Sequence, residues 1–269
     1  LFFAPPLQAQ SPDRLLTIEG REVAAWLPTS LDGAPVILFS HGFHGCATQS
    51  TFLMTRLQRA GYAVFAPQHA DAACLDPKKA MERPAVPFRM VERWNDTIYA
   101  DRRDDMKALL DALPKDERFA GLDWTKIGLA GHSLGGYTVM GLGGGWKSWK
   151  DARVDAVLAL SPYAAPYIQK RTLGGMAAPI MYQGGTNDPG ITPSIGKGGG
   201  AYAQTPAPKF YVEFQDAHHY AWSDRTDDPD HEAIADYSVA FFDHVLKGKP
   251  VPISWGKPDP NIADWRAEE

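Results

Sequence analysis

The sequence lacks several features that would assign it to a particular class of protein. No apolar run approaches the roughly 18 residues that a membrane-spanning helix needs. Basic residues are not in excess: the formal net charge is −5 and the pI is about 5.9. Nucleic-acid binding would need a basic face, so nothing here favours such a partner. We find neither an internal repeat nor a heptad pattern. A soluble enzyme or binding protein remains.

Cysteine is also scarce, and Cys46 and Cys74 are the only two in the chain. Each follows a predicted strand, in loops that should lie at the same end of the sheet. In an exported protein the two could form one disulfide, and two separate buried thiols are the alternative. Residues 1–4 are apolar and residues 5–11 resemble a small-residue cleavage site, so we interpret residues 1–12 as a signal-peptide remnant or a disordered N-terminus.

Length and composition are sufficient for one full-sized domain. The chain has 269 residues, of which 44% are hydrophobic. An α/β sheet of this size is routinely built as one domain. We therefore predict a single domain over residues 13–269, in a secreted or periplasmic protein.

The most informative stretch is residues 126–136, which read KIGLAGHSLGG. A short apolar strand leads into the pattern G-x-S-x-G, and the residues after it predict a helix. This order is typical of a nucleophile elbow, in which a serine lies on a sharp, strained turn. Gly131 and Gly135 lack side chains, so the strand and the helix can approach closely. Ser133 is therefore the candidate nucleophile, and a chance match in a Gly- and Ser-rich loop is the alternative.

Most of the chain alternates between apolar strands and amphipathic helices. The predicted strands are residues 15–18, 23–27, 35–40, 62–67, 127–130, 154–160, 179–183 and 210–214. The first two should form an antiparallel pair, and the continuous apolar runs after them are typical of strands buried on both faces. The pattern predicts an α/β fold with a mainly parallel central sheet of about eight strands and helices on both faces. The tail from Lys249 onward has four prolines and no core pattern.

Two segments interrupt this alternation. Residues 71–96 contain three prolines and no periodicity, and they are too long for a plain connection. We expect them to form a lid or a pocket wall, and we expect residues 191–208 to fold over the pocket as well. Between the first segment and the elbow, residues 97–113 predict a helix. Its apolar side chains should face inward, with the charged residues Arg102, Arg103, Asp104 and Asp105 pointing outward.

A serine hydroxyl needs a base, and the base needs an orienting acid, because the hydroxyl pKa is too high for unaided attack on an ester. In a parallel sheet, functional groups collect at the carboxyl ends of the strands. Asp188 directly follows one predicted strand and His219 follows another. The chain order Ser133, Asp188, His219 is the order that accompanies a nucleophile elbow. We predict that these three residues form a catalytic triad.

Other residues compete for the same roles. Asp216 is the chief rival acid, yet it lies three residues before His219 and is expected to shape the loop. His218 is the rival base, and because only one of two adjacent histidines can point into the pocket, we favour His219. Asp188 could instead be a turn former. His132, inside the elbow, is expected to pack or hydrogen-bond nearby, and we include it among the residues at the substrate site.

A metal site is the weaker interpretation of the remaining histidines. His41, His44 and His218 could suggest a metal ion, but no carboxylate or cysteine spacing completes a metal-binding motif. A serine nucleophile needs no cofactor. We therefore predict neither a metal nor a cofactor.

Two backbone N–H groups are candidates for an oxyanion hole. The N–H of Leu134 lies at the N-terminus of the predicted helix, where negative charge is favoured. The loop after residues 35–40 supplies the second donor, because Gly42 places a flexible residue just before the N–H of Phe43. The Phe43 ring would then form one wall of the acyl or alcohol pocket, and plain core packing is the alternative.

With these residues, the chain resembles the α/β-hydrolase superfamily over residues 15–248. Residues 39–43, the elbow, residues 186–188 and the loop at His219 are similar to one branch of it. That branch contains the dienelactone-hydrolase-like, platelet-activating-factor-acetylhydrolase-like and cutinase-like (polyester-cleaving) carboxylesterases. The charged start and Leu-Asp-Ala-Leu end of residues 101–113 are similar to the acetylhydrolase-like members. The resemblance implies an α/β-hydrolase fold and hydrolysis of carboxylic esters.

The chain departs from this branch at three places. True dienelactone hydrolases have a cysteine nucleophile where this chain has Ser133, which argues against their substrate. Cutinase-like enzymes have a tryptophan where this chain has Tyr163. Tyr163 could stack on the substrate or be a core or surface residue, and we include it among the candidate substrate-binding residues. The segment 71–96 is also longer than an open-cleft polyester hydrolase would have.

These observations lead to one hypothesis and two rivals. The hypothesis is a serine carboxylesterase that acts on short-chain or aryl esters, or on polyesters, and we expect a monomer. The first rival is a serine peptidase or thioesterase that uses the same triad on another acyl bond. The second is a catalytically silent hydrolase fold that only binds a ligand or partner.

Overall fold

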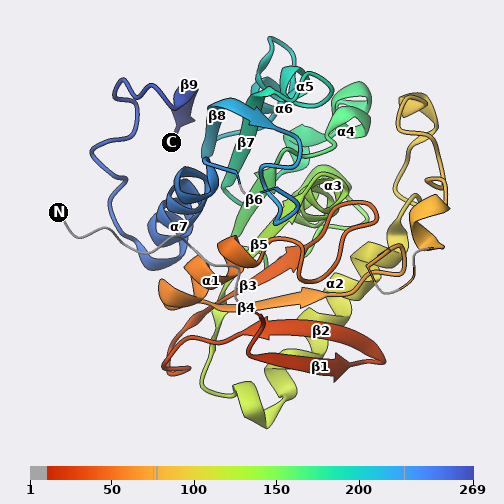
Figure 1. Ribbon diagram of the computed structural model, residues 1–269, viewed down its shortest axis with the longest axis vertical. Coiled ribbons are helices and arrows are strands. Elements are labelled where there is room, and N and C mark those ends of the chain that lie inside the picture. The colour runs from red at the N-terminus through yellow and green to blue at the C-terminus, as the bar shows by residue number, and fades with distance from the viewer. Residues whose placement is uncertain (1–10, 75, 77, 227) are drawn as a thin grey trace.

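A computed structural model describes residues 11–74, 76, 78–226 and 228–269 of the chain (Figure 1). The expected signal-peptide remnant therefore lies, up to residue 10, outside the described residues. Over the described residues the chain forms a nine-stranded sheet in the order β1-β2-β4-β3-β5-β6-β7-β8-β9. No helix in this part of the chain combines the length and apolarity needed to cross a membrane.

The sheet is mainly parallel, as predicted. Strands β3 to β8 run parallel to their neighbours, while β1, β2 and β9 add antiparallel pairs at the two edges. The strands are β1 (Arg14–Ile18), β2 (Arg21–Trp26), β3 (Pro35–Ser40), β4 (Ala63–Pro67), β5 (Asp123–His132), β6 (Ala156–Leu160), β7 (Ile180–Asn187), β8 (Lys209–His218) and β9 (Ile262–Glu268). The carboxyl ends of the parallel strands meet at one edge of the sheet, where functional groups can gather.

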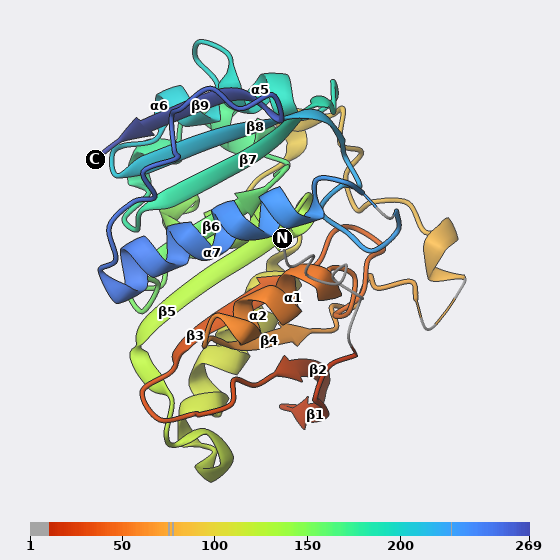
Figure 2. The same ribbon diagram turned by 60° about the vertical axis from the view of Figure 1, so that its left-hand side comes forward.

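Helices cover both faces of the sheet. They are α1 (Thr51–Arg59), α2 (Ala100–Ala112), α3 (Leu134–Met140), α4 (Ala165–Lys170), α5 (Thr192–Gly196), α6 (Ala201–Gln204) and α7 (His231–Lys247). Figure 2 shows α1 and α7 side by side across one face. Successive side chains of a strand alternate between faces, so Ile37 and Phe39 pack beneath α1 and α7, whereas Val36 and Leu38 pack in the core on the α2 and α3 side. Burial on both faces explains the continuous apolar runs.

The C-terminal tail contains a strand that its sequence did not indicate. Residues 262–268 form β9, which pairs antiparallel with β8 at the edge of the sheet. Only partly buried, β9 has little of the apolar pattern that marks an interior strand. Its backbone partners come from β8, and Trp265 packs against Trp255 and Tyr237. The sheet therefore has nine strands rather than about eight.

Helix α2 corrects a second expectation. Arg102 and Asp105 are buried, whereas Arg103 and Asp104 are more exposed. Residues three apart share a face of a helix, so Arg102 and Asp105 turn inward together. Burial of a charge requires a partner, and other elements supply Asp71 for Arg102 and Arg21 for Asp105. The helix sequence alone contains no sign of these partners.

The predicted wall segment, residues 71–96, contains the short 3-10 helices η1 (Lys79–Met81) and η2 (Val91–Arg93). It runs between β4 and α2, and Figure 1 shows it projecting from the body of the sheet. Trp94 is fully buried and anchors the end of the segment against Phe88, Tyr137 and Tyr163. A disulfide between Cys46 and Cys74 ties its beginning to the loop after β3.

Candidate active site

The elbow has the backbone conformation that a strained turn requires. Ser133 lies between β5 and α3 with φ 55° and ψ −113°, a region that residues with a side chain rarely occupy. A Cβ atom at Gly131 would overlap the backbone of Gly135, and one at Gly135 would overlap the carbonyl of Ser40. The two glycines therefore permit the close approach of strand and helix that lifts the serine above the sheet.

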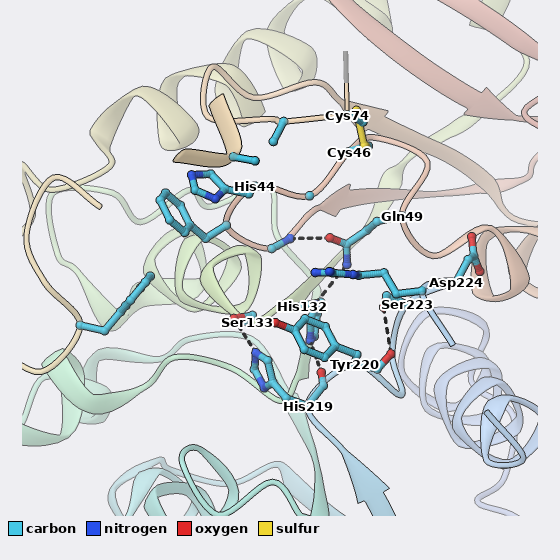
Figure 3. Close-up of a pocket in the computed structure, with 17 residues that line it drawn as sticks. His44, Cys46, Gln49, Cys74, His132, Ser133, His219, Tyr220, Ser223 and Asp224 are labelled. Carbon is cyan, nitrogen blue, oxygen red and sulfur yellow. Dashed lines mark hydrogen bonds between the residues drawn. A yellow bond between two sulfur atoms is a disulfide. The ribbon is translucent and has the colours of Figure 1, made fainter. Parts of the chain in front are cut away.

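The structure brings the three predicted catalytic residues together. The Oγ atom of Ser133 lies 3.0 Å from Nε2 of His219, and a dashed line marks this hydrogen bond in Figure 3. The Nδ1 atom of His219 lies 2.8 Å from Oδ2 of Asp188, which is buried beyond the end of β7. The carboxylate can only accept, so Nδ1 carries the proton and Nε2 is free to take one from the serine. The His219 side chain is 27 % exposed, so it remains within reach of a substrate.

Sequence reasoning missed one member of this group, Ser161 at the end of β6. Its hydroxyl donates to Oδ2 of Asp188 and lies 2.9 Å from Nδ1 of His219. Burial raises the pKa of Asp188, but the hydrogen bonds from His219 and Ser161 and the charge of His219 outweigh it and hold that pKa below its usual value. The signal was available, because Ser161 also follows a parallel strand end.

The rival acid and base point elsewhere. Asp216 is exposed, and its backbone N–H donates to the Thr186 hydroxyl, so the residue shapes the loop before His219. The His218 ring is 42 % exposed and faces Asp228, with Nε2 and Oδ2 3.5 Å apart. Within the described residues, neither is hydrogen-bonded to Ser133.

The two expected oxyanion donors belong to backbone segments beside Ser133. Leu134 begins α3, where the first N–H groups of a helix lack intrahelical partners. The N–H of Phe43 meets no acceptor among the residues that the structure describes. The preceding carbonyl, of Gly42, accepts from Nη2 of Arg102 at 3.1 Å. A trans peptide points its C=O and N–H in opposite directions, so this bond turns the Phe43 N–H away from Arg102.

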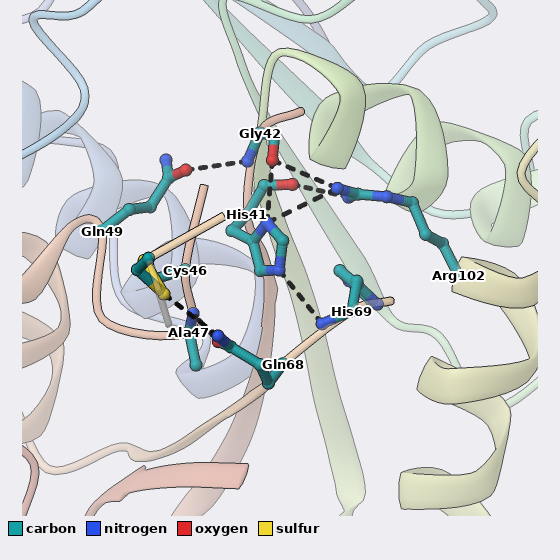
Figure 4. Close-up of a disulfide and its surroundings, with 9 residues drawn as sticks. His41, Gly42, Cys46, Ala47, Gln49, Gln68, His69 and Arg102 are labelled. Carbon is teal, nitrogen blue, oxygen red and sulfur yellow. Dashed lines mark hydrogen bonds between the residues drawn. A yellow bond between two sulfur atoms is a disulfide. The ribbon is translucent and has the colours of Figure 1, made fainter. Parts of the chain in front are cut away.

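Arg102 belongs to a closed polar cluster behind this loop (Figure 4). Its guanidinium pairs with Asp71, with Nη2 and Oδ2 2.7 Å apart, and donates to the carbonyl of His41 at 2.6 Å. Burial would raise the pKa of Asp71, but the charge and hydrogen bonds of Arg102 lower it. Burial, followed by the charge of Arg102, lowers the pKa of His41 and His69 well below the usual range. Both rings are therefore neutral near pH 7.

A cavity of about 670 Å³ opens beside Ser133. Its lining residues are Gly42, Phe43, His44, Gly45, Cys46, Gln49, Ala73, Cys74, Ala80, Phe88, His132, Ser133, His219, Tyr220, Ser223, Asp224 and Arg225. The Phe43 ring stacks on His44 at 3.7 Å between centroids and meets Phe88 edge-on at 5.7 Å, forming an aromatic wall. Ala73, Cys74, Ala80 and Phe88 of the segment 71–96 thus line the cavity.

Two expectations about the pocket were wrong. None of the lining residues comes from residues 191–208, and α5 and α6 in that segment pack instead beside β7 and β8. The opposite wall is made by residues 219–225. Tyr163 does not line the cavity either: it is buried, and its hydroxyl donates to the carbonyl of Phe88 at 2.6 Å. Tyr163 supports the aromatic wall from behind, whereas His132 does line the cavity.

The disulfide lies in this wall as well. Cys46 and Cys74 both line the cavity, one from the loop after β3 and one from the loop after β4. Gln68 braces the pair, because its Oε1 accepts from the N–H of Ala47 at 2.7 Å and its Nε2 lies 3.1 Å from the sulfur of Cys74. The bridge therefore connects the loop that carries the Phe43 N–H to the pocket wall.

Fold and site together define the class. A mainly parallel sheet, a serine on a strand-to-helix elbow, and an acid and a histidine at later strand ends are the features of an α/β hydrolase. The model of the dienelactone hydrolase family matches residues 23–238, so the chain belongs to the dienelactone hydrolase family. A comparison with curated proteins finds no match. The chain is thus a hydrolase of the α/β fold.

Proposed function

We propose that this protein is a serine carboxylesterase. The observation that carries the proposal is the hydrogen-bonded series from Ser133 through His219 to Asp188, which borders a cavity that Gly42 and Phe43 also line. Family membership supports hydrolysis in general, and the serine nucleophile supports an acyl-enzyme route.

The geometry supports a two-stage mechanism. The Oγ atom of Ser133 attacks the ester carbonyl while Nε2 of His219 takes its proton, and the ionised Asp188 stabilises the resulting imidazolium. The N–H groups of Phe43 and Leu134 bind the oxyanion of the tetrahedral intermediate. His219 returns its proton to the leaving alcohol oxygen. A water molecule, deprotonated by His219, then attacks the acyl-enzyme, and collapse of the second intermediate releases the acid and regenerates Ser133.

The walls of the cavity favour short-chain or aryl esters. Phe43 and Phe88 present aromatic surface close to Ser133, which suits a flat or compact apolar group. The wall formed by residues from the segment 71–96 confines the acyl or alcohol group on that side. We propose these esters as the substrate class.

We also propose that the protein works outside the cytosol, in the periplasm or as a secreted enzyme. The Cys46–Cys74 disulfide supports this location, because disulfides persist in oxidising compartments and are rare where thiols are kept reduced. Cell fractionation of the native host tests it, and recovery of fully reduced protein from the cytosol would contradict it.

The direct test is hydrolysis of p-nitrophenyl esters from acetate to palmitate. The wild type should prefer short chains, and Ser133→Ala should lose about 10⁴-fold or more in kcat/KM, because the nucleophile is removed. Thioesters and peptide p-nitroanilides run beside the esters identify the rival acyl substrates. A fluorophosphonate that labels the wild type but not Ser133→Ala separates an enzyme from a silent binder. A wild type that hydrolyses no ester would overturn the proposal.

A further inference from the structure

Two side chains outside the predicted triad, Gln49 and His132, connect the two loops that flank it. The role inferred for them rests on the proposed function. One side is the oxyanion loop, residues 41–50, and the other is the histidine loop, residues 218–225. The Gly42 N–H donates to Oε1 of Gln49 at 2.8 Å. The Nε2 atom of Gln49 lies 3.1 Å from Nδ1 of His132, and Nε2 of His132 lies 2.8 Å from the carbonyl oxygen of His219. Figure 3 shows Gln49 and His132 between the two loops.

The direction of every hydrogen bond in this series is fixed from its two ends. The backbone N–H of Gly42 can only donate, so the amide oxygen of Gln49 must face it and the NH₂ group must face His132. The backbone carbonyl of His219 can only accept, so Nε2 of His132 must carry a proton. Both constraints are met by one species of His132, the neutral ring with the proton on Nε2. Its Nδ1 atom then accepts from Gln49.

We propose that Gln49 and His132 are positioning residues that couple the oxyanion loop to the histidine loop, through a link that forms only with the neutral, Nε2-protonated ring of His132. At one end the link holds Gly42, next to the Phe43 N–H. At the other end it holds the backbone of the residue that serves as the base. The link would thus set the spacing between the oxyanion donor and the general base, two groups that must act on the same carbonyl.

The surroundings of His132 favour this neutral form. The ring is buried, and burial, followed by the neighbouring His219 ring 4.9 Å away, lowers the pKa of His132 to about 3. The charge of Asp188 and the hydrogen bond to the carbonyl of His219 act in the opposite direction and are weaker. The Trp222 ring, with its centroid 6.4 Å from that of His132 and its plane inclined by 20°, carries no charge. A proton on Nδ1 would also face the NH₂ group of Gln49.

Other contacts brace the two loops without using His132. The Ser50 hydroxyl donates to the carbonyl of Trp222 at 2.6 Å, and Asp224 accepts from the N–H and hydroxyl of Thr51, both at 2.7 Å. Variants of Gln49 therefore leave the loops anchored. Any change in activity can then be assigned to the link rather than to collapse of the site.

The test uses Gln49→Glu, with Gln49→Leu as its matched control. A carboxylate at position 49 still accepts from Gly42 but cannot donate to His132. The carboxylate and the carbonyl of His219 can both accept a hydrogen bond from His132 only if its ring is protonated on both nitrogens. We expect kcat/KM of Gln49→Glu to be near the wild-type value at low pH and to fall about tenfold as pH rises and His132 loses that proton, because one hydrogen bond is lost. Gln49→Leu should be lowered about tenfold at all pH values, with the wild-type profile shape.

The double variant Gln49→Glu/His132→Phe identifies the titrating group. It retains the added carboxylate but has no ring to protonate, so the fall at high pH should disappear. A purely space-filling role for Gln49 predicts profiles of the same shape for Gln49→Glu and Gln49→Leu. That result would overturn the proposal, as would a fall that persists in the double variant.

A second readout needs no activity. Two-dimensional ¹⁵N spectra of the histidine rings, with His132 assigned by its absence in His132→Phe, should show an Nε2-protonated neutral ring in the wild type at pH 7. In Gln49→Glu the ring should be an imidazolium at the same pH. An Nδ1-protonated or charged His132 in the wild type would overturn the link even in an active esterase. Conversely, a wild type with no esterase activity but the expected spectra would overturn the proposed function alone.

Discussion

The molecule contains two Ser–His–Asp arrangements with nearly the same hydrogen-bond geometry. In the open one, His219 lies 3.0 Å from the Ser133 hydroxyl and 2.8 Å from Asp188. In the closed one, Nε2 of His69 lies 2.9 Å from the hydroxyl of Ser40, and its Nδ1 atom lies 2.8 Å from Asp105. Distances alone do not distinguish the two.

Access and backbone conformation do distinguish them. Ser133 has a positive φ on its elbow and lines the cavity, as do Gly42 and Phe43 of the oxyanion loop. Ser40 ends β3 with a regular strand backbone and is fully buried, and no residue of its group is among those that line the cavity. An ester carbonyl therefore cannot reach the Ser40 hydroxyl.

The comparison shows that a hydrogen-bonded Ser–His–Asp group is not by itself evidence of catalysis. Such a group can also serve to satisfy the hydrogen bonds of a buried histidine. A buried histidine needs one partner for each ring nitrogen, and a carboxylate and a hydroxyl satisfy both. The closed group supports the oxyanion loop, because Arg102 reaches the Ser40 hydroxyl as well as the carbonyls of His41 and Gly42. The open group differs because Ser133 and His219 line the cavity, which gives a ligand access to the serine hydroxyl.

Substitution of His219 or of His69 by glutamine should give the largest difference between the two groups. His219→Gln removes the general base, so kcat/KM should fall about 10⁴-fold or more while the fold is retained. His69→Gln leaves the base in place, and we expect it to lower the free energy of unfolding by about 2–3 kcal/mol through unpaired buried groups. Ester hydrolysis and urea unfolding of both variants measure this contrast. A 10⁴-fold loss of kcat/KM in His69→Gln with an intact fold would show that the closed group takes part in the chemistry.

The two aspartates provide a sharper version of the contrast. Asp188→Asn offers an NH₂ group to Nδ1 and so stabilises the wrong tautomer of His219, which cannot accept the Ser133 proton, and kcat should fall about 10³- to 10⁴-fold. In Asp105→Asn the same tautomer change at His69 is harmless, because the Ser40 hydroxyl can accept as readily as it donates.

We therefore expect Asp105→Asn to keep kcat within about threefold of the wild type and to change the free energy of unfolding by only about 1 kcal/mol. Steady-state kinetics with one short-chain ester compares the two variants. Equal losses of kcat in the two would remove the distinction between the groups.

The pH dependence of stability should show the smallest effect. Burial lowers the pKa of His41, His69 and His132, so the folded protein leaves them neutral where the unfolded chain, with ordinary histidine pKa values near 6.5, takes up protons. The free energy of unfolding should fall as pH drops below about 6.5, by up to about 1.4 kcal/mol per pH unit for each histidine. Burial also raises the pKa of Asp230 to about 6 and raises that of Asp105, so proton uptake by these two carboxylates in the folded state opposes part of this loss.

Urea unfolding from pH 8 to pH 5 measures this slope. One of the three histidines, His69, belongs to the closed group, so His69→Gln should reduce the slope by about a third, whereas Asp188→Asn should not change it in this range, since the pKa of Asp188 is lowered. A stability that stays constant down to pH 5 would show that these rings are protonated in the folded state.

Part of the site could be predicted from the sequence because its signals are local. Gly131 and Gly135 mark the elbow around Ser133, and the ends of apolar runs mark where Asp188 and His219 leave the sheet. The same rule would have selected Ser161, which directly follows β6. Gln49 has no such signal, because its role depends on its position between Gly42 and His132.

Contacts between helices, strands and loops decide which charged side chains are buried. The pattern of α2 does not reveal that Arg102 faces inward, since an arginine can be buried only where other segments supply acceptors, here Asp71 and the carbonyl of His41. Which segments form the pocket walls also depends on contacts between elements. Residues 191–208 pack beside β7 and β8, and residues 219–225 take the place expected for them.

The sequence by itself determined the α/β class, the elbow and the order of the three predicted catalytic residues, because strand periodicity and glycine spacing act over a few neighbouring residues. Only the tertiary structure decided which of two Ser–His–Asp groups meets the cavity, which charges are buried and which segments form the walls. Those properties depend on packing between residues far apart in the chain, such as Ser40, His69 and Asp105. No local sequence pattern encodes such packing.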